Sequence, residues 1–170
     1  MQIAYTIAPG RGDTDLLLAG LADALAARDV RTVGTVQINT ECEGEGPCDM
    51  DVRVLPGGPV LRISQTLGAG ARGCRLDPGA LETAIGLCEA RLDGAGILIV
   101  NKFGKQEALG RGFRGLIGDA LAQGIPVLVG LNRLNQDAFH DFTGNAAVEI
   151  APNETALLAW VDEVLAQTAE

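Results

Sequence analysis

The stretch ILIVNKFGKQEALGRGFR, residues 97 to 114, joins a run of consecutive apolar residues to the densest cluster of basic residues in the chain. Residues 97 to 100 are consecutive and mostly β-branched, which is typical of a strand buried on both faces. Four basic residues and one acid follow: Lys102, Lys105, Arg111, Arg114 and Glu107. Because the whole chain carries a formal net charge of −9, this local positive field predicts a site for an anion at the end of the strand.

An ordinary solvated surface is the alternative interpretation of this cluster. Glu107 and Arg111 are four residues apart, and at the start of a helix they would form an exposed pair of little energetic weight. Lys102 and Lys105 would then simply face water. Spacing alone does not choose between the two interpretations.

Length and composition predict a single domain, residues 1 to 170, with a substantial core, since 47% of the residues are hydrophobic. No apolar run approaches the roughly 20 residues of a membrane span, and the N-terminus lacks the features of a signal peptide. We therefore expect a cytoplasmic protein. A pI near 4.5 and an aromatic content of 4% argue against a nucleic-acid partner, so the expected partner is a small anionic ligand, and a homo-oligomer is compatible with the sequence.

The N-terminal third predicts a βαβ unit. A strand over residues 2 to 8 is broken by PGRGD, and a helix follows, capped by Asp13 or Thr14. Its expected buried stripe comprises Leu17, Leu21, Ala24 and Leu25. A second strand over residues 30 to 38 should run parallel to the first, because βαβ crossovers are right-handed and connect parallel strands.

The same alternation continues through the rest of the chain. A hairpin is predicted from short strands at residues 52 to 55 and 60 to 65, followed by a helix over 78 to 91 whose stripe includes Cys88. After the central strand come a helix through residues 113 to 121, a strand at 126 to 131, a polar linker at 132 to 145, a short strand at 147 to 150, and a helix capped near Asn153. The sequence therefore predicts an α/β fold with a β-hairpin inserted between parallel strands.

The cysteines give a weak metal signal. Cys42 and Cys48 have five residues between them, whereas structural zinc pairs usually have two to four. Cys74 differs, because Arg72 and Arg75 flank it within a glycine-rich segment and nearby positive charge favours a thiolate. Cys74 is the candidate for a reactive or ligating thiol, and a half-buried thiol in a structured loop is the alternative. The only histidine, His140, has no recognisable nucleophile or ligand spacing around it.

The first loop departs from a phosphate-binding P-loop, which requires Gly, four residues, then Gly-Lys-Ser/Thr. Aligning Gly12 and Thr14 with that ending places Ile7 at the first glycine and Asp13 at the lysine. Two unit charges about 4 Å apart interact by roughly 4 kcal/mol at an effective dielectric near 20, so an acid here disfavours ordinary hydrolysis of Mg-ATP. A simple strand-to-helix turn is the alternative. Phosphate-binding candidates remain in the loop: Gly10, Arg11, Gly12 and Thr14.

Three segments carry a family resemblance: RISQTLGAGARGCRLDPGALE (62 to 82), VNKFGKQEALGRGFR (100 to 114) and GIPVLVGLNRLN (124 to 135). They closely resemble the bacterial family called domain of unknown function 2478, over essentially the whole chain. That family is grouped with P-loop NTPase-like folds and often occurs alongside molybdate transport or molybdenum-enzyme genes. More distantly, Gly104, Lys105 and Glu107 resemble the G-K-x-E that follows the Walker B aspartate in small nucleoside-triphosphatases, with Asn101 at the aspartate position.

The resemblance implies a three-layer fold with a mainly parallel, P-loop-like sheet, and it leaves several function hypotheses open. The first is a degenerate P-loop-like protein that binds a nucleotide or related phosphate, with weak or absent hydrolysis. The sequence does not decide whether this binding requires magnesium. The second is a non-enzymatic molybdate or tungstate protein using the basic residues around Cys74, and the third is a module that docks an acidic partner. Expected ligand-binding residues are Gly10, Arg11, Gly12, Thr14, Arg72, Arg75, Asn101, Lys102, Lys105, Glu107, Arg111 and Arg114.

Overall fold

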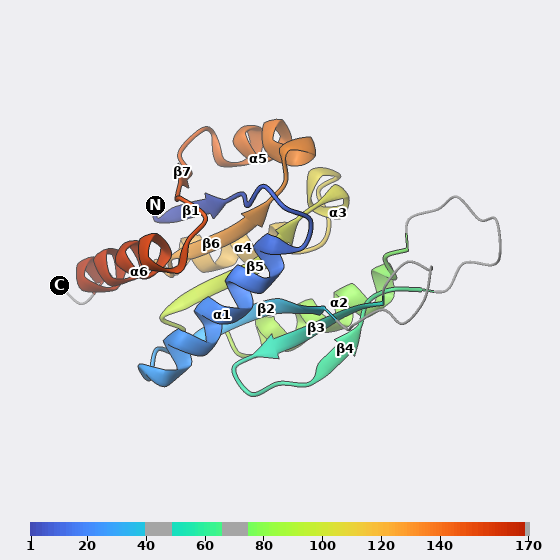
Figure 1. Cartoon of the computed structure of the whole chain (residues 1–170), viewed down its shortest axis with the longest axis horizontal. Helices are drawn as coiled ribbons and strands as arrows, with labels where there is room; N and C mark the ends of the chain where they lie inside the picture. The colour runs from blue at the N-terminus through green and yellow to red at the C-terminus, as the bar shows by residue number, and fades with distance from the viewer. Residues whose placement is uncertain (40–48, 66–74, 169–170) are drawn as a thin grey trace.

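A computed structural model describes residues 1 to 39, 49 to 65 and 75 to 168. Within them, seven strands form one sheet in the order β4-β3-β2-β5-β6-β1-β7 (Figure 1). Their bounds are β1 Ile3–Thr6, β2 Thr32–Asn39, β3 Met50–Leu55, β4 Val60–Arg62, β5 Ile97–Phe103, β6 Val127–Leu131 and β7 Val148–Glu149. The pairs among β2, β5, β6, β1 and β7 are parallel, which confirms the predicted mainly parallel sheet.

The predicted central strand lies at the middle of the sheet, between β2 and β6. Residues 97 to 100 are fully buried, and successive side chains enter different cores. Leu98 and Val100 belong to one core, whereas Ile97 and Ile99 belong to the other. This division explains the continuous apolar run, because successive side chains of a strand point to opposite faces and both faces are covered here.

Helices cover both faces and give the predicted three-layer α/β fold. α1 (Asp13–Ala27) and α6 (Glu154–Thr168) pack on one face, and α2 (Pro78–Glu89), α4 (Arg114–Ala122) and α5 (Gln136–Thr143) supply buried residues to the core of the other. In Figure 1, α1 passes in front of the sheet, whereas α2 and α4 lie behind it. Two short elements, α3 (Lys105–Ala108) and η1 (Arg133–Asn135), follow β5 and β6. In the described part of the chain, no helix is long and apolar enough to cross a membrane.

The inserted hairpin extends the sheet at one edge. β3 pairs antiparallel with β2 and with β4, so the two strands continue the sheet beyond its parallel part. β4 ends at Arg62, earlier than predicted. β2 therefore lies between β3 and β5 in the sheet.

Two helical details differ from the sequence prediction. The buried stripe of α1 comprises Leu18, Leu21, Ala22 and Leu25, whereas Leu17 and Ala24 are only partly buried, so the stripe is rotated by about one residue. The N-cap of α1 is Gly12, and neither Asp13 nor Thr14 caps it. By contrast, the predicted stripe of α2, including Cys88, is buried as expected.

The prediction of a polar linker at residues 132 to 145 was wrong, because η1 and α5 occupy it. One aromatic residue explains why α5 forms. Phe139 is fully buried and packs edge-on against Phe103 at 5.1 Å and Tyr5 at 5.4 Å between ring centroids. His140 lies beside it, with Nε2 3.4 Å from the Tyr5 hydroxyl. The apolar residues of this helix, Ala138, Phe139 and Phe142, lie at helical spacing and pack in one core, so the signal was present in the sequence.

Candidate functional site

The loop between β1 and α1 is shaped by a glycine and a threonine. Gly12 has a φ of 79°, a left-handed conformation that glycine adopts without a steric penalty. The backbone N–H of Ala8 donates to Thr14 Oγ1 at 3.0 Å, which ties the start of the loop to the helix. No side chain accepts a hydrogen bond at the N-cap of α1. The N–H of Asp13 donates to the carbonyl oxygen of Gly10 at 3.3 Å. The N–H groups of Thr14 and Asp15 and the positive end of the helix dipole remain available at this loop.

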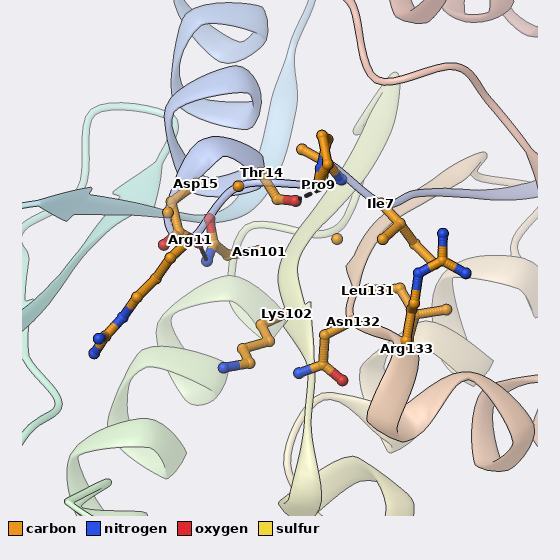
Figure 2. A pocket seen from close by; sticks show the side chains of 14 residues that line it. Ile7, Pro9, Arg11, Thr14, Asp15, Asn101, Lys102, Leu131, Asn132 and Arg133 are labelled. Carbon is orange, nitrogen blue, oxygen red and sulfur yellow. Dashed lines mark hydrogen bonds between the residues drawn. The ribbon is translucent and has the colours of Figure 1, made fainter.

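A cavity of about 650 Å³ opens beside this loop. Three segments line it: residues 7 to 12 with Thr14 and Asp15, Asn101 and Lys102 in β5, and residues 130 to 133 at the end of β6 (Figure 2). They meet because β1, β5 and β6 are parallel and end at the same edge of the sheet. Gly130 permits the close approach of β5, since a side chain at this position would collide with the carbonyl oxygen of Asn101.

Cationic side chains predominate around this cavity. Arg11, Lys102 and Arg133 line it, and Asp15 is the acidic side chain among its described lining residues. In the view of Figure 2, Arg11 and Arg133 lie on opposite sides and Lys102 lies between them. All three cations are exposed. The cavity therefore presents exposed positive charges from three different segments to a ligand.

Asn101 is a buried connector at the back of the cavity. It is 5% exposed; its Nδ2 donates to Asp15 Oδ1 at 2.9 Å, and its Oδ1 accepts from the backbone N–H of Gln37 at 2.9 Å. Burial raises the pKa of Asp15, while the hydrogen bond from Asn101 and the charge of Lys102 oppose that rise. Asn101 thus joins β5, β2 and α1, and both polar atoms of its side chain are engaged.

Glu107 has a similar connecting arrangement in the next loop. It is 3% exposed, and its carboxylate accepts from the backbone N–H of Gly104 at 2.9 Å and of Phe113 at 3.0 Å. The carboxylate therefore joins the start of α3 to the residue before α4. These bonds go to the backbone, so the alternative interpretation of Glu107 as the surface partner of Arg111 was wrong.

The remaining predicted residues are distributed unevenly. Arg75 and Lys105 line a second cavity of about 360 Å³, together with Glu107 and Lys102. The guanidinium of Arg114 stacks over the ring of Phe142 at 4.7 Å. Arg111 is exposed, and neither it nor Arg114 lines either cavity. Arg72 and Cys74 lie outside the described residues. The structure thus brings together Gly10, Arg11, Gly12, Thr14, Asn101 and Lys102 around the 650 Å³ cavity.

Among the lining residues with polar or charged side chains, sequence reasoning missed three: Asp15, Asn132 and Arg133. Asn132 and Arg133 directly follow the buried strand β6, and residues at the carboxyl ends of parallel strands are the usual ligand contacts in such sheets. That signal was present in the sequence. The side-chain Oδ1 of Asn132 accepts from the backbone N–H of Asn135 at 3.1 Å, which fixes the turn into η1.

Two solved structures resemble this fold. THEP1 from the hyperthermophile Aquifex aeolicus aligns with a TM-score of 0.62 and 16% identity, covering 98% of each chain. A human cancer-related nucleoside triphosphatase aligns with a TM-score of 0.58 and 16% identity, covering 88% of this chain and 87% of the other. At this identity the likeness establishes the fold, which is P-loop NTPase-like.

Sequence comparison establishes the family. A protein named molybdenum import ATP-binding protein ModC 2, from Bradyrhizobium diazoefficiens, is 33% identical over 162 residues. The alignment covers 94% of this chain but only 18% of that relative. Residues 3–160 match the model of the family described as protein of unknown function DUF2478. The chain therefore belongs to the DUF2478 family, and it has a P-loop NTPase-like α/β fold.

Proposed function

We propose that this chain binds a nucleotide or a related phosphate ligand in the 650 Å³ cavity, with weak or absent hydrolysis. The observation that carries the proposal is the meeting of the uncapped N-terminus of α1 with Arg11, Lys102 and Arg133 around one cavity. Unpaired backbone N–H groups and the helix dipole favour an anion at such a terminus. The three cations supply charge neutralisation from sides that the helix does not reach.

The charge distribution supports an anionic ligand. Three cationic side chains and one acidic side chain line the cavity, in a chain of net charge −9. A concave site with an excess of one charge concentrates ligands of the opposite charge. The names of the relatives agree with this choice of ligand, since one is called an ATP-binding protein and another a nucleoside triphosphatase.

Weak or absent hydrolysis is proposed from the groups that the site offers. Asn101 carries an amide whose polar atoms are both engaged, and Glu107 accepts two backbone hydrogen bonds away from this cavity. Asp13 occupies the position where a P-loop has its lysine. Neither the charge-neutralising lysine nor a free carboxylate base is therefore supplied at the expected positions.

Magnesium has a small set of protein donors here. Mg²⁺ is usually held by one or two carboxylates together with the phosphates of the substrate. The Thr14 hydroxyl and the Asp15 carboxylate are the residues that would hold it in this cavity. When bound, the ion would neutralise phosphate charge. Because Asp15 already accepts a hydrogen bond from Asn101, we expect nucleotide binding to depend only weakly on Mg²⁺.

Titration calorimetry tests the proposal with ATP, ADP and GTP, each with Mg²⁺ and with EDTA. The double variant Arg11→Gln, Lys102→Gln should bind ADP at least tenfold more weakly, about 1.4 kcal/mol. The control variant is Arg28→Gln, because Arg28 lies at the far end of α1 and pairs with Asp162 at 2.6 Å. It removes one positive charge, against two in the double variant, without touching the cavity, so ADP affinity should stay unchanged.

If no nucleotide binds, titrations with other anions test which ligand the cavity accepts. The relative named for molybdenum import motivates titrations with molybdate and tungstate. Binding of these ions without nucleotide binding would replace the proposal with a compact-oxyanion site. Turnover of ATP near the enzyme median of about 10 s⁻¹, lost in the double variant, would overturn the claim of weak hydrolysis while supporting nucleotide binding.

A further inference from the structure

The 360 Å³ cavity adjoins the first one on the side of the sheet covered by α2. Asn101, Lys102 and Asn132 line both cavities. Its walls, however, are largely apolar and come from β3, the segment after β4, α2 and the residue before α4: Val52, Ile63, Leu81 and Phe113. Lys102, Lys105 and Arg75 add positive charge to this lining and Glu107 adds one negative charge, while Arg75 also lies 3.7 Å from Asp49. The second cavity thus combines an apolar body with a cationic border, whereas the first is lined mainly by loop backbone and charge.

Thr35 provides a second, independent observation inside this cavity. It lies in β2, lines the cavity and is only 2% exposed. Its neighbours two residues away, Val33 and Gln37, lie on the same face of the strand. No hydrogen bond from the Thr35 hydroxyl to any other described residue is present, although this is among the most buried polar side chains of the described chain. The buried side-chain atoms without a partner among the described residues are Arg53 Nε and His140 Nδ1, not the Thr35 hydroxyl. This hydroxyl therefore reaches the space of the cavity, where it can meet a polar atom of a ligand.

We propose that the 360 Å³ cavity is a second ligand site, which binds a small organic anion with an apolar body about the size of two fused rings. The body would lie against Leu81 and Phe113, the anionic group would meet Lys102 and Lys105, and a polar group would meet the Thr35 hydroxyl. Cavities of this volume are of the usual size for small-molecule sites, which combine apolar walls with a few polar groups. The site is independent of nucleotide binding in the first cavity, although Lys102 is common to both.

Three probes separate the features of the proposed ligand. Naphthalene-1-sulfonate has both the apolar body and the charge, inorganic sulfate has only the charge, and 1-naphthalenemethanol has only the body. By titration calorimetry, naphthalene-1-sulfonate should bind at least tenfold more tightly than either of the others. Equal affinity for sulfate would show that the apolar walls contribute nothing to binding. Equal affinity for the neutral alcohol would show that the cations contribute nothing. Either result overturns the proposal, as does the absence of binding by naphthalene-1-sulfonate.

Two charge variants assign the probe to one cavity. Lys105 lines the second cavity only, and Arg133 lines the first only. Both side chains are exposed, so their replacement should leave the fold intact. Lys105→Gln should weaken naphthalene-1-sulfonate binding about fivefold and change ADP affinity by less than twofold, and Arg133→Gln should do the opposite. If Arg133→Gln weakens the probe, or ADP displaces it completely from wild-type protein, the probe occupies the first cavity and the second-site proposal is wrong. Failure of ADP to bind would leave the probe result intact, so the two proposals fail separately.

Discussion

Replacing Glu107 with glutamine tests whether this residue is a structural connector or a reactive carboxylate. In the structure its two carboxylate oxygens each accept one backbone N–H, from Gly104 and from Phe113. A glutamine side chain offers one oxygen and one NH₂ group. It can keep only one of the two bonds, and its NH₂ group must then face the other backbone N–H. Glu107→Gln should therefore destabilise the loop that follows β5.

The size of the effect follows from the burial of the carboxylate. Hydrogen bonds to a charged group contribute about 1.5 to 3 kcal/mol each, and neutral ones about 1 kcal/mol. Losing one charged bond, weakening the other and leaving one N–H unpaired gives a loss of about 2 to 4 kcal/mol. For a chain of 170 residues, each kcal/mol lowers Tm by roughly 2 to 4 °C. The expected decrease in Tm is thus about 5 to 15 °C.

Urea unfolding followed by circular dichroism gives the free energy of unfolding, with Glu82→Gln as the control. Glu82 is exposed on α2, and its replacement should change stability by less than about 0.5 kcal/mol. A second pair of variants, at two glycines, tests the position of the Glu107 carboxylate. Gly112 and Gly110 both have positive φ, but a side chain at Gly112 would collide with Glu107 Oε1 whereas Gly110 has open space. Gly112→Ala should therefore cost clearly more than Gly110→Ala.

A change below about 0.5 kcal/mol for Glu107→Gln would refute the connector role. If that small change came with loss of nucleotide turnover, Glu107 would instead be a catalytic group, and the proposal of weak hydrolysis would fail with it. Equal costs for the two glycine variants would show that the carboxylate does not occupy the place beside Gly112.

Three further predictions concern buried groups. Thr35→Val should change the free energy of unfolding of the ligand-free protein by less than about 1 kcal/mol in urea titrations, because the Thr35 hydroxyl faces the cavity and forms no hydrogen bond with a described residue; a larger loss of stability would contradict this. Because burial raises the pKa of Asp15 above its ordinary value of 3.8, ionisation of Asp15 costs stability as pH rises through its folded pKa. The stability of Asp15→Asn relative to wild type should therefore increase from pH 4 towards pH 7, and a pH-independent difference would count against it. Burial raises the pKa of Cys88 to about 12, so a variant with serine at the other three cysteines should react with iodoacetamide only after unfolding, and rapid labelling of the native protein would refute this.

Much of the fold followed from the residues alone because its signals are local. The run from 97 to 100 identified the central strand, since four consecutive apolar residues fit a strand covered on both faces. The spacing of Leu81, Ile85 and Cys88 identified the buried face of α2. In both cases the spacing of the apolar residues determines which side chains are buried, so the sequence predicts the buried positions correctly.

Two local features were mispredicted: the helix α5 and the cap of α1. α5 is predominantly polar, and its formation depends on Phe139 packing against Phe103 and Tyr5, residues from distant strands. The cap of α1 was assigned to Asp13 or Thr14 from residue preference. In the structure, Thr14 Oγ1 instead accepts from Ala8, and Gly12 takes the cap position.

The candidate site was predictable in its location but not in its composition. Strand ends and glycine-rich loops indicated the carboxyl edge of the sheet, where Arg11 and Lys102 now line one cavity. Charge alone could not separate Lys102 from Arg114, whose guanidinium stacks on Phe142 from α5. Nor could sequence show that Glu107 is buried, because its hydrogen bonds go to backbone groups that have no sequence signature.

Amide chemical-shift mapping with ADP tests the central claim most directly. In ¹H–¹⁵N spectra recorded during an ADP titration, the largest changes should fall on Gly10, Arg11, Gly12 and Lys102, which line the 650 Å³ cavity. Amides in β3 and β4, at the far edge of the sheet, should stay unchanged. No change at the β1–α1 loop at saturating ADP, or changes centred on Lys105 and Phe113 instead, would contradict nucleotide binding at the N-terminus of α1.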